Sequence, residues 1–148
     1  MSYLNWFNAH ASKHKKIVDR LLDNGYTKEM IVDYFDFDNM VVKEVDFCPL
    51  YKKNKKCHEM DKLNCYLCAC PNFVFDDEGL EIRDDFKILS RCRVGNGDDF
   101  IGKGVIHHDC SKCEVPHHKT FIMENFSTNW GTIMARCTNG KIKDDSKD

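Results

Sequence analysis

The sequence predicts an α+β fold: a small, metal-stabilised and loop-rich core with a β-hairpin, an N-terminal helical pair and a C-terminal helix. Three observations lead to this fold class. Helical periodicity fills the segment before the first cysteine, nine cysteines occur in 148 residues, and strand-like apolar runs follow the cluster between Cys48 and Cys70. The length fits a single domain, residues 1–148, divided into a helical segment at 1–46, a cysteine-rich metal-binding core at 47–118, and a C-terminal helix and tail at 119–148.

A first helix is predicted from Ser2 to Leu22. Its apolar and aromatic residues recur at steps of three and four, which places on one face Leu4, Phe7, Ala11, Val18 and Leu21. Ser2 can cap the start of this helix, and Gly25 can end it in the left-handed conformation. His14 occupies the vacant step of the pattern, and a lone histidine on such a face is more often packed than bound to a metal.

Two shorter elements follow before the first cysteine. Thr27 can cap a second helix, whose apolar and aromatic positions are Met30, Ile31, Tyr34 and Phe35. Residues 38–46 predict a short helix or turn built on Met40, Val41 and Val45.

The second half of the chain predicts a β-hairpin and a last helix. Strand-like runs at 86–94 and 100–106 flank Gly95-Asn-Gly-Asp-Asp, which has the composition of a turn. Asn129 to Cys137 predicts a helix that ends before Gly140, with inward-facing Trp130, Ile133 and Met134. The polar residues 141–148 predict a frayed tail.

The cysteine content indicates either disulfides in an oxidising compartment or metal ligation in a reducing one. The first ten residues lack the basic and apolar segments and the small-residue cleavage site of a signal peptide, so we expect a cytoplasmic protein. No apolar run approaches the roughly 18 residues of a membrane-spanning helix. An odd number of cysteines also leaves one unpaired in any all-disulfide arrangement. We therefore expect thiolate ligands.

Nine side chains are candidate metal ligands: Cys48, Cys57, His58, Cys65, Cys68, Cys70, Cys110, Cys113 and His117. Two C-x2-C pairs, at 65–68 and 110–113, are the strongest signal, because two such loops can supply four thiolates to one tetrahedral zinc ion. The surplus of ligands favours two zinc ions, and spacing leaves their partition open. An Fe–S cluster is the alternative cofactor, although the histidines favour zinc. Cys92, inside a predicted strand, and Cys137 are interpreted as structural thiols.

Three motifs resemble a known family. They are Cys57-His58, Asn64-Cys65-Tyr-Leu-Cys68-Ala-Cys70-Pro71 and Asp109-Cys110-Ser-Lys-Cys113-Glu-Val-Pro116-His117. This combination resembles the prokaryotic cysteine-rich small domain family, a probable metal-binding and zinc-finger-like domain, over about residues 47–117. The resemblance implies metal binding at the matching cysteines and at His117, and it leaves any reaction undefined. The flanking helices look like additions to the family core.

Other function classes have weaker support. Cys57-His58-Glu59 followed by Cys65-x2-Cys68 matches a zinc deaminase poorly, and no catalytic triad, phosphate-binding glycine loop or H-E-x2-H motif occurs, so no catalytic residue is assigned. The basic segment Lys52–Lys56 keeps open a zinc-stabilised module that binds RNA or a protein partner. Neither DNA nor a membrane is an expected partner.

Overall fold

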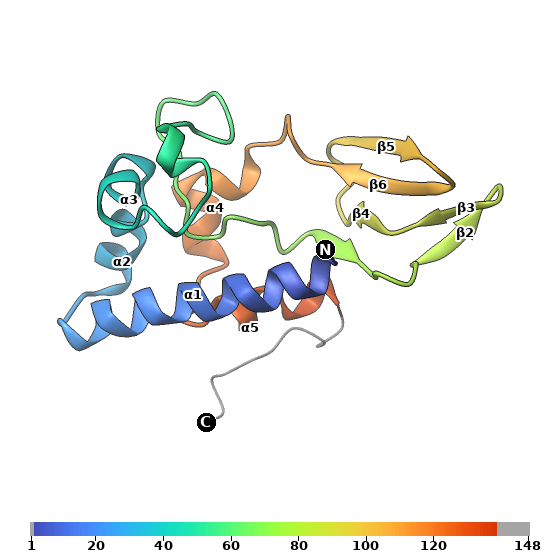
Figure 1. Cartoon of the computed structure of the whole chain (residues 1–148). Coiled ribbons are helices and arrows are strands. Elements are labelled where there is room, and N and C mark those ends of the chain that lie inside the picture. The colour runs from blue at the N-terminus through green and yellow to red at the C-terminus, as the bar shows by residue number, and fades with distance from the viewer. Residues whose placement is uncertain (1, 139–148) are drawn as a thin grey trace.

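The computed structural model describes residues 2–138 and confirms the α+β class, with N-terminal helices, two small sheets and a short C-terminal helix (Figure 1). The helices gather at one end of the molecule and the strands at the other (Figure 1). Most of the cysteines lie on the loops between these two ends. Within residues 2–138, no helix has both the length and the apolar character needed to cross a membrane.

The first helix, α1 (Tyr3–Asp23), forms as its periodicity predicts. The Ser2 side chain caps it by accepting a hydrogen bond from the Asn5 amide at 3.1 Å, and Gly25 follows in the left-handed region with φ of +80°. The buried face carries Phe7, His10, Ala11, His14, Ile17, Val18 and Leu21. Tyr3 connects this helix to the strands, because its hydroxyl lies 2.5 Å from His107 Nδ1 and 3.2 Å from Ser90 Oγ.

His14 is a packed core residue, as the sequence predicts. Its ring is fully buried, it stacks on Phe35 with 4.8 Å between ring centroids, and its Nε2 donates to the Tyr66 carbonyl at 2.7 Å. Burial lowers the pKa of His14 from 6.5 to about 3, and the hydrogen bond to Tyr66 acts in the opposite direction. Burial also lowers the pKa of His10, whose ring stacks on Trp6. The helix therefore carries two neutral imidazoles.

The buried His14 predicts that acid destabilises the protein. Below pH 6.5 the unfolded chain binds a proton at this position, whereas the folded protein binds one only near pH 3. We expect the free energy of unfolding to fall by up to about 1.4 kcal/mol per pH unit across this window from His14 alone. Urea unfolding of the wild-type protein and His14→Gln at pH 7 and pH 5.5 measures the effect. Equal pH dependence in the two proteins would contradict it.

The predicted second helix is confirmed, and the third element is a helix that begins and ends earlier than predicted. Thr27 caps α2 (Lys28–Tyr34) by accepting from the Met30 amide at 3.3 Å. The following helix, α3 (Phe37–Lys43), begins before the predicted range and buries Phe37 and Met40. Val45 does not build this element, since it lies beyond the helix and is 42% exposed.

Six short strands form two sheets. In the first, β1 (Phe73–Phe75) pairs with β4 (Ser90–Cys92) in antiparallel fashion. The second has the order β2 (Glu81–Arg83), β3 (Phe86–Ile88), β6 (Val105–Asp109) and β5 (Asp98–Gly102). Only the β3–β6 pair is parallel among these described strands. The Ser90 hydroxyl joins the two sheets by accepting from the His108 amide at 2.7 Å.

Besides a hairpin of β2 and β3, whose turn is Asp84 and Asp85, a second hairpin lies later in the chain than predicted. It consists of β5 and β6, joined by a two-residue turn in which Lys103 and Gly104 have φ of 51° and 78°, the left-handed values of the tightest hairpin turns. The predicted first run, 86–94, divides instead between β3 and β4, which join different sheets. Gly95 and Gly97 do form turns with positive φ, but this segment connects two sheets.

The C-terminal part adds one predicted helix and one that the sequence analysis missed. Asn129 caps α5 (Trp130–Met134) by accepting from the Thr132 amide, and a 3-10 turn η3 (Ala135–Cys137) extends it. Trp130, Ile133 and Met134 face inward as predicted. The missed helix is α4 (Lys119–Glu124), which follows the 3-10 turn η2 (Val115–His117). Gly140 and the predicted frayed tail at 141–148 lie outside the described residues.

The main core lies between α1 and α5. Trp130 is fully buried and packs against Phe7 and His10, and its indole N–H donates to the Leu67 carbonyl. Tyr66 and Leu67, which precede Cys68, are also fully buried. The helical core therefore holds the loop segment that leads to Cys68 in place.

Candidate metal centre

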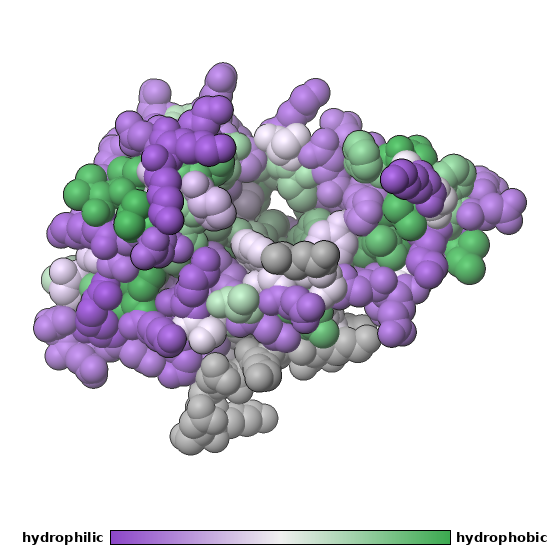
Figure 2. Space-filling view, viewed as in Figure 1, coloured by the Kyte–Doolittle hydropathy of each residue, from purple (hydrophilic) through white to green (hydrophobic). Residues whose placement is uncertain are grey.

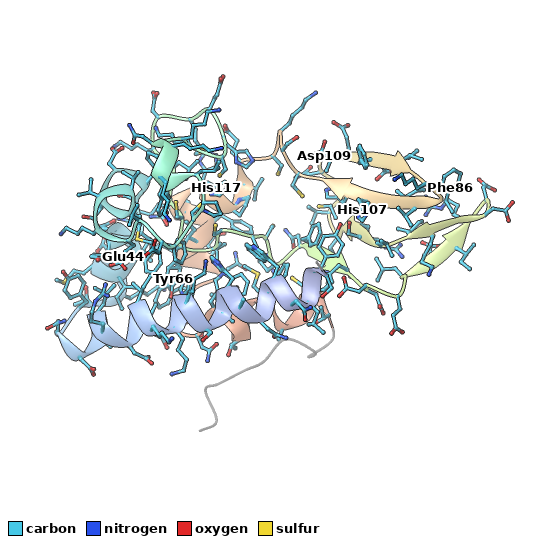
Figure 3. All side chains as sticks on the ribbon, in the orientation of Figure 1. Glu44, Tyr66, Phe86, His107, Asp109 and His117 are labelled. Carbon is cyan, nitrogen blue, oxygen red and sulfur yellow. The ribbon has the colours of Figure 1, made fainter. Side chains whose placement is uncertain are left out.

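Three of the predicted ligands meet at one point. The ligand atoms of Cys57, His58 and His117 lie within 4.8 Å of one another, and within residues 2–138 they form the only such group of three or more Cys, His, Asp or Glu. Cys57 and His58 come from the loop after the 3-10 turn η1 (Tyr51–Lys53), whereas His117 ends η2. In Figure 3, His117 lies above Tyr66, on the side of the helices that faces the strands.

Both imidazoles are already oriented as ligands. His117 Nδ1 donates to the Asn64 carbonyl at 3.0 Å, which leaves Nε2 with its lone pair 3.6 Å from Cys57 Sγ. His58 Nε2 lies 3.3 Å from the Cys110 carbonyl, and its Nδ1 lies 3.2 Å from the same sulfur. A carbonyl can only accept, so these bonds fix the tautomer of each ring. This arrangement, with the outer nitrogen on a carbonyl, is typical of metal-binding histidines.

Asn64 joins the site to the helices. Its backbone N–H donates to the His117 carbonyl at 3.1 Å, in return for the bond that its own carbonyl accepts from the His117 ring. The side-chain amide donates to the Val32 carbonyl and to Asp36, both at 2.7 Å, and its oxygen accepts from the Tyr66 amide. Asn64 is 2% exposed, so this network is rigid and positions His117.

Three further thiols surround Cys57. Burial raises the pKa of Cys65 to about 12, and the neighbouring Cys57 and Cys48 raise it further. Burial also raises the pKa of Cys68, and Cys65, Cys48 and Cys57 act in the same direction. Cys48, Cys57, Cys65 and Cys68 therefore form one group, in which several negative charges are unfavourable without a cation. A bound metal replaces the thiol protons and makes the thiolates stable.

Tyr51 contributes a hydroxyl to the edge of this group. The residue is 4% exposed, and its hydroxyl makes no well-formed hydrogen bond to nitrogen or oxygen in the described structure. It lies against the Cys65 thiol, where its O–H lowers the pKa of that thiol in opposition to burial. Tyr51 is thus a ready donor to a metal-bound thiolate at Cys65. Sequence reasoning missed it, because a tyrosine three residues after Cys48 carries no specific signal.

The remaining predicted ligands belong to a second group. Burial raises the pKa of Cys110 to about 12, and Cys113, Cys70 and Cys92 raise it further. The four sulfurs of the two C-x2-C loops do not converge on one point in the described structure, although Cys68, Cys110 and Cys113 line the same cavity. Cys92 does not lie mid-strand as expected, since it is the last residue of β4.

A cavity of about 500 Å³ connects the two groups. Its lining includes Cys57, His58, Cys68, Cys70, Cys92, Cys110, Cys113 and His117. The space-filling view shows a hollow between the helical end and the strands (Figure 2). Cys137 is not part of the lining; it is fully buried and its thiol donates to the Cys70 carbonyl at 3.5 Å.

The lysines of the basic segment contact their own chain. Lys56 Nζ donates to the Met60 and Asp61 carbonyls at 2.9 and 3.1 Å, and Lys52 lies 3.7 Å from Asp46. Lys13, on α1, donates to the Phe47 carbonyl at 3.0 Å. These contacts fasten the loop that leads to Cys57, which gives the lysines a structural task apart from any partner.

The fold and the site define a cysteine-rich α+β protein with a candidate Cys/His metal centre. Comparison with protein-family models, with curated proteins and with solved structures finds no match to this chain.

Proposed function

We propose that the protein binds zinc through Cys57, His58 and His117, with one thiolate from the surrounding group as the fourth ligand, and that this ion stabilises the fold. The observation that carries the proposal is the meeting of one sulfur and two correctly oriented imidazole nitrogens within 4.8 Å. We propose Cys65 as this fourth ligand, because it is 5% exposed and directly follows Asn64, whose carbonyl holds the His117 ring.

The donor set favours zinc over other metals. Thiolate together with imidazole suits zinc, which takes four such ligands in a tetrahedron, whereas magnesium and calcium require oxygen ligands. An Fe–S cluster is usually bound by thiolates alone, and two of the three closest ligand atoms here are imidazole nitrogens. The resemblance to the prokaryotic cysteine-rich small domain family supports the same proposal.

The structural role follows from the number of available ligands and from the loop that they fasten. Several thiols surround the three closest ligand atoms, so a fourth protein ligand can close the coordination sphere, as in structural zinc sites. Between α3 and β1 the only helix or strand described is η1. A zinc ion therefore supplies binding free energy, on the order of 10 kcal/mol, to a segment with little secondary structure of its own.

The zinc content of a His117 variant, compared with that of a variant at the neighbouring His118, tests the proposed site. We expect His117→Ala to lose one zinc ion per chain, because it removes a ligand whose ring is already oriented by Asn64. His118→Ala is the matched control, since His118 is exposed and pairs with Glu114 at 3.5 Å. Native mass spectrometry and elemental analysis count the metal. Unchanged zinc in His117→Ala, or purified wild-type protein that contains iron and acid-labile sulfide in place of zinc, would overturn the proposal.

A further inference from the structure

We propose that Cys70, Cys92, Cys110 and Cys113 form a second, separate zinc site with four thiolate ligands. This inference deepens the proposed function and adds Cys92, which no sequence motif marked as a ligand. All four residues line the same cavity. These four thiolates complete a tetrahedral zinc site by themselves, so Cys57, His58 and His117 remain available to the first centre.

Three of these cysteines begin tight turns. The amide three residues later donates to the carbonyl of each cysteine: Phe73 to Cys70 at 2.9 Å, Gly95 to Cys92 at 3.2 Å, and Cys113 to Cys110 at 2.9 Å. Such turns curl the chain around the first side chain and leave nearby amides free to donate to its sulfur.

The strand pairing brings these turns to one place. In the first sheet Phe73 is the direct partner of Cys92, and Phe73 also closes the turn that begins at Cys70. Cys110 directly follows β6, which contacts β4 through the Ser90 to His108 hydrogen bond. The end of β4, the turn before β1 and the end of β6 therefore lie together, although they are far apart in the sequence.

The four cysteines line one cavity, but their sulfurs do not converge as closely as the ligand atoms of the first centre. Cys110 and Cys113 share one turn, and the pairing of Phe73 with Cys92 places the Cys70 turn beside Cys92. No three of the four sulfurs lie within 4.8 Å of one another. Zinc–sulfur bonds of about 2.3 Å therefore require the side chains to turn inward, and the cavity gives them room to do so.

Four residues separate Cys65 of the first centre from Cys70 of the second, and Cys68 is one of them. Cys68 has a φ of 47°, a left-handed conformation that is uncommon for a residue with a side chain, and it reverses the local direction of the chain. Cys70 then begins the turn that Phe73 closes, beside Cys92. The hydrogen bond of His58 to the Cys110 carbonyl joins the two sites.

Two arginines offset the charge of such a site. Four thiolates and one zinc ion carry a net charge of −2. Arg136 Nε donates to the Pro71 carbonyl at 3.2 Å, and Pro71 directly follows Cys70. Arg93 donates to the Arg136 carbonyl at 2.7 Å. The site therefore has cationic groups at its border, and no carboxylate is among the four ligands.

Metal counts on variants of the full chain test the second site independently of the first. We expect two zinc ions in the wild-type protein, one in Cys92→Ser, one in His117→Ala and two in Cys137→Ser, whose thiol lies outside the cavity. Two zinc ions in Cys92→Ser would overturn the second site. A single wild-type zinc that is lost in His117→Ala but kept in Cys92→Ser would overturn it too, and would leave the proposed function standing. A single wild-type zinc that is kept in His117→Ala but lost in Cys92→Ser would overturn the first centre alone.

Cobalt substitution keeps the test valid if Cys92→Ser fails to fold. In the wild-type protein, we expect cobalt to give sulfur-to-metal charge-transfer absorption from both sites. Cys92→His retains a ligand at this position, so we expect two bound cobalt ions with weaker charge transfer and a shifted visible band. An unchanged spectrum would exclude Cys92 from the coordination sphere, and iron bound at the four cysteines would overturn the zinc assignment.

Discussion

Removal of zinc is expected to unfold the cysteine-rich part of the protein, residues 47–118. Structural zinc contributes on the order of 10 kcal/mol per ion, whereas a domain of this size is stable by only about 5–15 kcal/mol in total. The loops between α3 and β1 have one 3-10 turn, and the strands have three to five residues each. A bound ion therefore supplies a large share of the free energy that orders this segment.

A chelator titration followed by two probes measures this effect. We expect near-UV circular dichroism, which reports packed aromatic rings, to fall steeply with zinc loss, while far-UV helical signal from α1 persists in part. The same chelator saturated with zinc beforehand is the control for nonspecific effects. Identical urea unfolding curves with and without metal would contradict a structural role.

Replacement of the central tryptophan is expected to have the next largest effect. Trp130 is fully buried between Phe7 and His10, and its N–H satisfies the Leu67 carbonyl. Trp130→Ala leaves a large cavity and an unpaired buried carbonyl, so we expect a loss of about 3–5 kcal/mol. Urea unfolding of the zinc-loaded protein measures it.

Trp6 provides the matched comparison. Its ring lies 6.2 Å from that of Trp130, but the residue is 38% exposed, so Trp6→Ala removes the same side chain from a partly solvated position. We expect a clearly smaller loss of stability and an unchanged zinc content in this variant. Equal losses in the two variants would show that the core is not centred on Trp130.

Local signals predicted the helices well, and tertiary contacts decided the strands. Ser2, Thr27 and Asn129 each cap a helix as their side-chain chemistry predicts. The strands are too short to carry a clear alternating pattern, so the hairpin was predicted from its turn residues alone. The glycines at 95 and 97 are a stronger turn signal than Lys103 and Gly104, although the latter turn joins β5 to β6. Helix α4 was missed because it has six residues and no side-chain cap.

The candidate ligands could be predicted, but their partition could not. C-x2-C spacing indicates that two sulfurs of one loop converge, yet it does not indicate which loops meet. Cys68 adopts a left-handed backbone conformation, and no residue type in that position signals it. Cys92, which we propose as a ligand, carries no such motif, because strand pairing rather than sequence spacing brings it beside the Cys70 turn.

The packing of α1 against α5 has a consequence for how the metal-binding segment becomes ordered. These two helices lie near opposite ends of the described chain, so their contact closes the polypeptide into one large loop that contains every predicted ligand. The entropic cost of closing this loop grows only with the logarithm of its length, and the packing of α1 against α5 offsets it. Ligands from residues 48 and 117 then find each other at a high effective concentration, as in an intramolecular reaction. Hydrogen exchange during refolding with zinc is therefore expected to protect α1 before it protects the hairpin of β5 and β6.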